Sequence, residues 1–233
     1  MVKAADKIRL EPIEHIYWLG NRLIPGYSEI CRELGVTKPN PFHTPEGREE
    51  GVSLHLWLGF LARGKTPAGP PDPRIAGRVK GIEKFLSDTG FKIVGGETPQ
   101  YDPLLNYAVT PDLWGHIGNW SWVIEAKRGA KLPGHRLQTI AQLIALGANG
   151  FRAQKRGCLY LSDNSYRLVE HTDKNDRVNW AAIVEGYHAM SADQRALFAQ
   201  GGLDARDPAV LGMRPGKTWN KIVSADNARS AYK

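Results

Sequence analysis

An aspartate, a glutamate and a lysine lie close together in the segment TPDLWGHIGNWSWVIEAKRG, at residues 110–129 of the 233-residue chain. Asp112 follows a Thr-Pro pair, and Glu125 and Lys127 lie two residues apart. Because residues i and i+2 of a β-strand point to the same face, a strand here would place Glu125 and Lys127 side by side. A hairpin turn near Gly118 would bring Asp112 next to them. Two carboxylates beside an ammonium group suit a hard divalent cation and a phosphate.

The chemistry of such a group is metal-assisted hydrolysis of a phosphodiester. Magnesium and manganese prefer carboxylate and water oxygens, so Asp112 and Glu125 are candidate ligands, and the carbonyl of Ala126 is a third. The ion would polarise the phosphoryl oxygen and help to generate hydroxide from bound water. Lys127 would orient that water or stabilise the charge that develops on phosphorus. The alternative is a solvated ion pair beside a turn-capping aspartate; the Pro-Asp turn and the helix predicted after Lys127 favour the site.

Composition limits the class of protein and its partners. The formal net charge is +7, so the expected large partner is a polyanion. Cys31 and Cys158 are the only cysteines, which excludes a four-cysteine zinc or iron–sulfur site and favours a reducing cytosol. The N-terminal sequence shows no secretory pattern, and no stretch approaches the roughly 20 apolar residues of a membrane span. We therefore expect a soluble cytoplasmic protein without a membrane partner.

The hydrophobic pattern predicts an α/β fold that would position this group. Thr44 and Pro45 form a helix start, and period-two segments follow a helix that ends at Gly90. The predicted elements are a hairpin over 15–25, helices over 28–35, 45–63 and 72–90, strands over 91–101, 105–117 and 120–127, a helix over 135–149, strands over 157–163 and 165–171, and a helix from 178 to about 200. We expect one domain over residues 1–200 with a mixed sheet, and a basic C-terminal arm over 201–233.

The central segment resembles a known superfamily. PDL at 111–113, followed by IEAK at 124–127, resembles the PD-(D/E)XK nucleases. The resemblance implies a restriction-endonuclease-like core of helix, three strands, helix and strand, which here would span about residues 74–171. An N-terminal hairpin and further helices would be additions to that core.

Three flanking segments are similar to the branch that contains RecB-type nuclease domains, lambda-exonuclease-like proteins and mitochondrial genome maintenance exonucleases. GVSLH at 51–55 matches a G-x-x-x-H motif, which implies that His55 is a metal ligand. LQTIAQ at 137–142 matches Q-x-x-x-Y through Gln138. The opening IYWLGNRLIPGYSEICRELG looks like the start of phage exonucleases. The sequence departs from the branch at Gln142, where tyrosine is usual, and at Gly59, where an acidic residue often follows the histidine.

Polar residues near the start of the predicted helix 135–149 are candidates for contacts with DNA. Backbone N–H groups at a helix start favour anions, and basic side chains surround this one. The predicted DNA-binding residues are Gln138, Gln142, Arg128, Lys131 and Arg136. Glu97 is a candidate for an extra acidic group behind the metal ligands, whereas Glu46, Glu49 and Glu50 are expected on a solvated helix face.

The resemblance implies a Mg²⁺- or Mn²⁺-dependent deoxyribonuclease with Asp112, Glu125 and Lys127 as its catalytic residues. The metal ligands would be His55, Asp112, Glu125 and Ala126. The implied mode is exonucleolytic, on linear DNA ends in phage-type recombination or DNA processing, and single-stranded regions and a homo-oligomer fit the same branch. Its setting would be a bacterial or phage-infected cell. The alternatives are a structure-specific or restriction-type endonuclease on the same fold, and a non-catalytic DNA-binding accessory protein.

Overall fold

The fold is described from a computed structural model, which describes residues 7–11, 15–37, 44–65, 67–129, 131–132, 134–190 and 192–194. The chain divides into two compact units. One comprises Met1–Pro39, Pro103–Ala108 and Asp173–Lys233, and the other comprises Asn40–Asp102 and Val109–Thr172. Every predicted site residue belongs to the second unit. The single domain over residues 1–200 stays a prediction, and the arm over 201–233 lies outside the described residues.

The described part of the first unit contains a small antiparallel sheet and two helices. The predicted hairpin over 15–25 is confirmed as β2 (Ile16–Leu19) and β3 (Arg22–Ile24), and β1 (Ile8–Glu11) extends its sheet in the order β1-β2-β3. The helices are α1 (Tyr27–Glu33) and α5 (Asp176–Ala189). They pack together through the rings of Tyr27 and Trp180, whose centroids lie 5.2 Å apart. The Tyr187 hydroxyl on α5 donates a hydrogen bond to Glu29 Oε1 on α1 at 2.9 Å.

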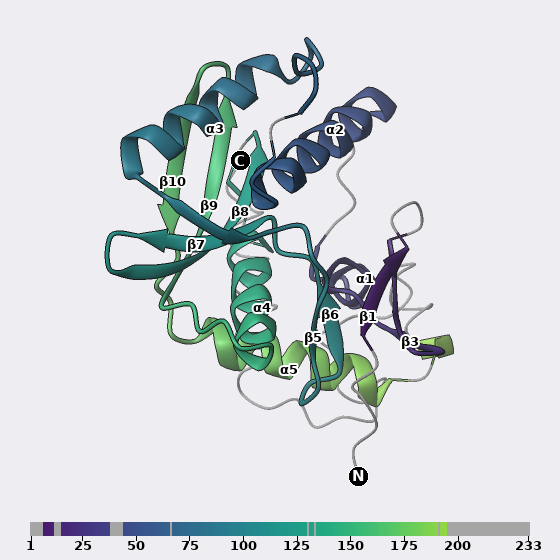
Figure 1. Cartoon of the computed structure of the whole chain (residues 1–233). Coiled ribbons are helices and arrows are strands. Elements are labelled where there is room, and N and C mark those ends of the chain that lie inside the picture. The colour runs from purple at the N-terminus through teal and green to yellow at the C-terminus, as the bar shows by residue number, and fades with distance from the viewer. Residues whose placement is uncertain are drawn as a thin grey trace, which may run out of the picture. The chain divides into compact units, whose positions relative to one another are not determined.

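The second unit is built on the mixed five-stranded sheet that the sequence predicted (Figure 1). Its strands are β4 (Lys92–Gly95), β7 (Leu113–Ile117), β8 (Trp120–Arg128), β9 (Lys155–Ser162) and β10 (Ser165–Glu170), in the order β10-β9-β8-β7-β4. β8 and β9 are parallel, and the other neighbouring pairs are antiparallel. β8 is therefore central, with β7 on one side and β9 on the other.

Three helices flank this sheet: α2 (Pro45–Ala62), α3 (Ala76–Thr89) and α4 (Gly134–Ala148). Thr44 caps α2 as predicted, because its hydroxyl accepts from the Gly47 N–H at 3.1 Å. α3 begins later than predicted. The Asp72 carboxylate accepts from the Arg74 N–H, and the Asp72 carbonyl accepts from the Ile75 N–H, so residues 72–75 form a turn before the helix.

The two faces of β8 serve different purposes. Trp122, Ile124 and Ala126 point into a hydrophobic core with side chains of α2 and α3. Strand residues alternate between faces, so Glu125 and Lys127 point to the opposite face, where α4 packs on β8 and β9. The described members of the core are Leu54, Leu58, Ile82, Phe85, Phe91, Leu113, Trp122, Ile124, Ala126, Leu159 and Leu161.

The strands predicted over 91–101 and 105–117 are each broken in two. The first contains β4 and the short β5 (Gln100–Asp102), and the second contains β6 (Tyr107–Val109) and β7. The first run ends at Gly95, before the left-handed Glu97, and each break also contains a proline, at 99 or 111, which lacks the N–H that a continuous ladder needs. The break before β7 leaves Asp112 at the start of that strand. None of the helices in the described part of the chain has the length and apolar composition that a membrane span requires.

Candidate active site

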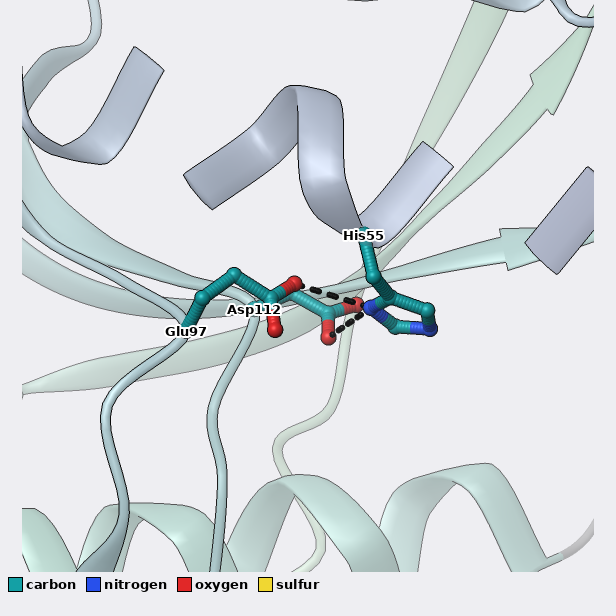
Figure 2. A group of neighbouring side chains, drawn as sticks. All are labelled: His55, Glu97 and Asp112. Atoms are coloured by element: carbon teal, nitrogen blue, oxygen red, sulfur yellow. Dashed lines mark hydrogen bonds and ion pairs between the residues drawn. The ribbon is translucent and has the colours of Figure 1, made fainter. Parts of the chain in front are cut away.

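Three potential metal ligands converge in the second unit (Figure 2). His55 comes from α2, Glu97 from the segment after β4, and Asp112 from the residue before β7. His55 Nδ1 lies 2.8 Å from Glu97 Oε1 and 3.2 Å from Asp112 Oδ1. One ligand atom from each of the three residues lies within 4.8 Å of the others. Carboxylate oxygens suit both Mg²⁺ and Mn²⁺, whereas an imidazole nitrogen is a donor for transition-metal ions such as Mn²⁺ rather than for Mg²⁺.

Backbone contacts hold Glu97 beside Asp112. The Glu97 N–H donates to the Pro111 carbonyl at 2.9 Å, and Glu97 has a left-handed backbone with φ of 47°. A Cβ on Gly96 would lie 2.2 Å from the Asp112 carbonyl oxygen, so only glycine allows the two segments to approach this closely. On α2, an added Cβ at Gly59 would lie 3.6 Å from Glu97 Cβ and Cγ. The Glu97 side chain thus lies over Gly59. This is the position at which the RecB-type and lambda-exonuclease-like branch often has an acidic residue.

Asp112 joins this group to β8. Its Oδ2 accepts a 2.6 Å hydrogen bond from the Ala126 N–H, and the side chain is 2% exposed. The pairing of Leu113 with Ile124 confirms the predicted hairpin between β7 and β8. Asp112 therefore lies next to the strand segment that carries the predicted catalytic glutamate and lysine.

Glu125 and Lys127 share a face of β8, as the spacing predicted. Lys127 Nζ donates to Glu125 Oε1 at 2.7 Å. Two amides of α4 contact the same carboxylate: Gln138 Nε2 donates to Oε1 at 2.7 Å, and Gln142 Nε2 donates to Oε2. Glu125 is 2% exposed and is thus enclosed by these donors.

The pKa shifts of the residues around Asp112 follow from burial and from the negative charge of several neighbouring carboxylates. Burial raises the pKa of Glu97 to about 7, and burial followed by the charge of Asp112 raises the pKa of Glu125. The charge of Asp112 is the main cause that raises the pKa of His55. Burial disfavours the charged form of Lys127, but the carboxylates of Glu125 and Asp112 outweigh it and raise its pKa. A divalent cation would compensate the carboxylates, so the residues present fit a metal site.

The described cluster of potential ligands overlaps only in part with the predicted metal ligands, and the ligand roles of Glu125 and the Ala126 carbonyl stay predictions. His55 and Asp112 are brought together as expected, but the third member of the described cluster is Glu97. Glu125 instead directs its oxygens to Lys127 and the two glutamines, and Ala126 contributes its N–H to Asp112. The signal for Glu97 in the sequence is weak, since a glutamate after two glycines is an ordinary loop residue.

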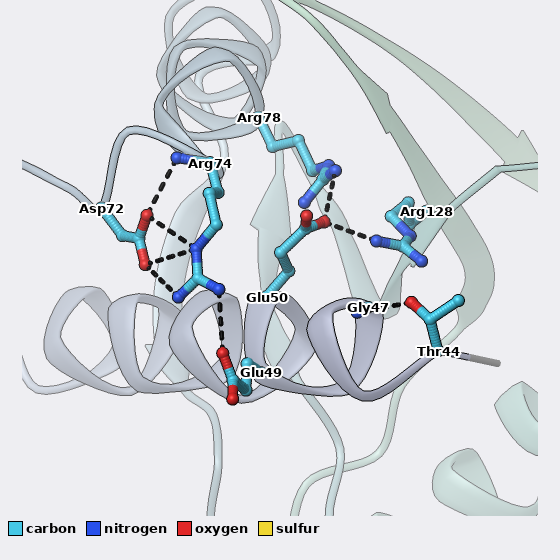
Figure 3. A network of polar contacts seen from close by, with 8 residues as sticks. All are labelled: Thr44, Gly47, Glu49, Glu50, Asp72, Arg74, Arg78 and Arg128. Carbon is cyan, nitrogen blue, oxygen red and sulfur yellow. Dashed lines mark hydrogen bonds and ion pairs between the residues drawn. The ribbon is translucent and has the colours of Figure 1, made fainter.

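Arg128 lies in a different polar network (Figure 3). It follows Lys127 on β8 and therefore points to the opposite face of the sheet, toward α2 and α3. Arg128 Nη1 and Arg78 Nη2 both pair with Glu50 Oε2, the latter at 2.9 Å. Glu49, expected to be solvated like Glu50, also pairs with an arginine, Arg74, at 2.9 Å. A DNA phosphate at Arg128 would have to compete with the Glu50 carboxylate.

The other predicted DNA contacts lie around α4. Lys131 is exposed, and Arg136 and Gln138 are half-buried in the first turns of the helix. Gln142 is 1% exposed, so it offers no surface to DNA in this structure. The DNA-binding role of Lys131, Arg136 and Gln138 stays a prediction.

No family model matches the chain. No curated protein matches it either. Among solved structures, the chain is similar to that of an alkaline exonuclease from Laribacter hongkongensis, with 13% sequence identity and a TM-score of 0.44. The similarity covers 76% of this chain and 92% of the exonuclease. A likeness this remote establishes neither a family nor an activity.

Replacing Glu97 with glutamine should weaken Mn²⁺ binding by at least about tenfold, because a ligand carboxylate is lost while the side-chain volume is kept. Isothermal titration calorimetry with MnCl₂ measures the affinity. Glu46→Gln, an exposed position in the first turn of α2, is the matched control and should bind Mn²⁺ like the wild type. An unchanged affinity in Glu97→Gln would exclude Glu97 from the ligand set.

Proposed function

We propose that this protein is a Mg²⁺- or Mn²⁺-dependent deoxyribonuclease that hydrolyses phosphodiester bonds from DNA ends. The observation that carries the proposal is the convergence of His55, Glu97 and Asp112 within 4.8 Å, next to a hairpin that also bears Glu125 and Lys127. Each of these residue types can take part in metal-assisted phosphodiester hydrolysis. The potential ligand atoms of His55, Glu97 and Asp112 come from three separate segments of the chain.

The residues divide the chemistry between them. A bound divalent ion would polarise the scissile phosphoryl group and favour deprotonation of water. His55, Glu97 and Asp112 would hold that ion, while Asp112 also fixes the position of β8 through the Ala126 N–H. Lys127 would place its ammonium group against the charge that develops on the phosphoryl oxygens. Glu125 orients this ammonium through its 2.7 Å hydrogen bond.

DNA as the substrate is supported by charge and by the surroundings of the site. The chain has a formal net charge of +7, and Lys131 and Arg136 lie near the first turn of α4. Cationic side chains next to a catalytic group attract a polyanion in a salt-dependent manner. The exonucleolytic mode and a role in phage-type recombination or DNA processing follow from the sequence resemblance and form part of the proposal.

The test uses two forms of one DNA, an end-labelled linear duplex and the covalently closed circle, each with Mg²⁺, Mn²⁺ or EDTA. We expect the linear form to be degraded from its ends with either metal, the circle to survive, and EDTA to stop the reaction. Cleavage of the circle would favour the endonuclease alternative. Degradation that continues in EDTA, or DNA retention without cleavage in both metals, would overturn the proposed enzyme.

A further inference from the structure

The carboxylate of Glu125 is held on both oxygens by the side chains around it. Oε1 accepts from Lys127 Nζ and from Gln138 Nε2, each at 2.7 Å. Oε2 accepts from Gln142 Nε2. A carboxylate oxygen has two lone-pair directions, so the described side chains use both on Oε1 and one on Oε2. Oε2 is therefore the oxygen of Glu125 that can still interact with a cation or a water molecule.

Gln142 determines where that oxygen lies. The last torsion of a glutamate is broad and has no strong intrinsic preference, so the plane of its carboxylate is set by the donors around it. Without Gln142, both remaining donors would act on Oε1, and Oε2 could swing about that anchored atom. Gln142 is 1% exposed and lies on the buried face of α4 with Ala141 and Ala145, so water has little access to replace its amide.

The other half of the Gln142 amide lowers the stability of the fold. Its Oε1 is buried and accepts no hydrogen bond from the residues that the structure describes. A buried polar atom without a partner destabilises the folded protein, and an apolar side chain of similar length would avoid that cost. The contact with Glu125 is what the amide contributes that an apolar side chain could not.

We propose that Gln142 is a positioning residue, whose amide fixes the Glu125 carboxylate so that Oε2 is presented, as a further ligand, to the divalent cation of the active site. This inference rests on the proposed function and refines it. It also replaces the DNA contact that the sequence predicted for Gln142, since a residue buried beneath Glu125 acts on the site through that carboxylate.

Gln142→Met and Gln154→Met form a matched pair that tests the inference. Gln154 also anchors β8, because its Oε1 accepts from the Ser121 N–H at 3.1 Å, four residues before Glu125. Both substitutions remove an amide contact to the same strand. The measurements are the Mn²⁺ dissociation constant by calorimetry, kcat and KM on DNA, and the thermal unfolding midpoint.

We expect Gln142→Met to weaken Mn²⁺ binding by about 10–100-fold and to lower kcat with KM for DNA unchanged, as for other residues that orient a metal-site carboxylate. Gln154→Met should keep the wild-type affinity and kcat. If the methionine variant does not fold, Gln142→Asn takes its place, because the shorter amide cannot reach Oε2. Wild-type values in the folded Gln142 variant would overturn the inference, and so would a raised KM with unchanged kcat and Mn²⁺ affinity.

The wild-type protein separates this inference from the proposed function. If the wild type binds Mn²⁺ without cleaving DNA, the proposed function fails, while the Mn²⁺ affinities of the two variants still decide the role of Gln142. If the wild type cleaves DNA and Gln142→Met equals it, only the positioning role fails. A wild type that binds no Mn²⁺ overturns both.

Discussion

Lys127→Met should lower the rate of DNA hydrolysis by about 10²–10³-fold while Mn²⁺ binding stays close to that of the wild type. Methionine keeps much of the lysine stem but offers no charge to the phosphoryl oxygens. The ammonium group is held in place by its 2.7 Å hydrogen bond to Glu125 Oε1, and the carboxylates of Glu125 and Asp112 favour its protonated form. Single-turnover cleavage of a labelled linear duplex with Mn²⁺ measures the rate directly.

Lys84→Met is the control for this substitution. Lys84 also forms a 2.8 Å ion pair with a carboxylate, that of Asp88, but on the exposed surface of α3. The surface variant should cleave DNA at the wild-type rate. Lys127→Arg should not restore activity, since the larger planar guanidinium does not reproduce the position of the half-buried ammonium beside Glu125. Activity within a few-fold of wild type in Lys127→Met would mean that another residue stabilises the reacting phosphate.

The central hairpin could be predicted because its information is local. Every second residue of a strand points to the same face, which places Glu125 and Lys127 together on β8. The Pro-Asp turn brings Asp112 to the start of β7. The start of α2 at Pro45 was equally readable, since Thr44 and proline are a direct signal for a helix N-terminus. Each of these predictions depends on residues within a few positions of each other.

The sequence predicted Glu97 as an extra acidic group but not its position beside His55 and Asp112, because that position depends on the approach of two segments that are distant in sequence. Its position follows from a left-handed backbone, a hydrogen bond to Pro111 and the missing Cβ of Gly96. None of these features identifies a ligand in the sequence alone. The burial of Gln142 likewise depends on how α4 is rotated against the sheet.

The DNA contact of Arg128 stays a prediction, but the direction of its side chain could have been inferred from the sequence. The prediction grouped Arg128 with residues near Lys127 as one phosphate-binding rim. Neighbouring residues of a strand point to opposite faces, so the same rule that pairs Glu125 with Lys127 directs Arg128 away from them. The structure bears this out, since Arg128 pairs with Glu50 on α2.

Asp112→Asn should abolish Mn²⁺ binding and reduce DNA hydrolysis by at least about 10³-fold, since it removes the several kcal/mol that a bound ion contributes to the transition state. Asparagine keeps the size of the side chain, and its amide oxygen can still accept from the Ala126 N–H, so the anchor to β8 survives. What asparagine lacks is the negative charge that pairs with His55 and would bind the metal ion. The substitution therefore separates the structural role of Asp112 from its role as a ligand.

The thermal unfolding midpoint measures the difference in Mn²⁺ binding between the wild type and Asp112→Asn without any DNA. A ligand at 100 times its dissociation constant stabilises the folded state by about 2.7 kcal/mol, which corresponds to a rise of about 5–11 °C for a chain of this size. Wild type should show such a rise with Mn²⁺, and Asp112→Asn should show none. Asp88→Asn, which alters a surface ion pair on α3, should keep the full rise. An equal rise in Asp112→Asn would place the bound ion elsewhere, because only a site that uses the Asp112 charge loses its metal when that charge is removed.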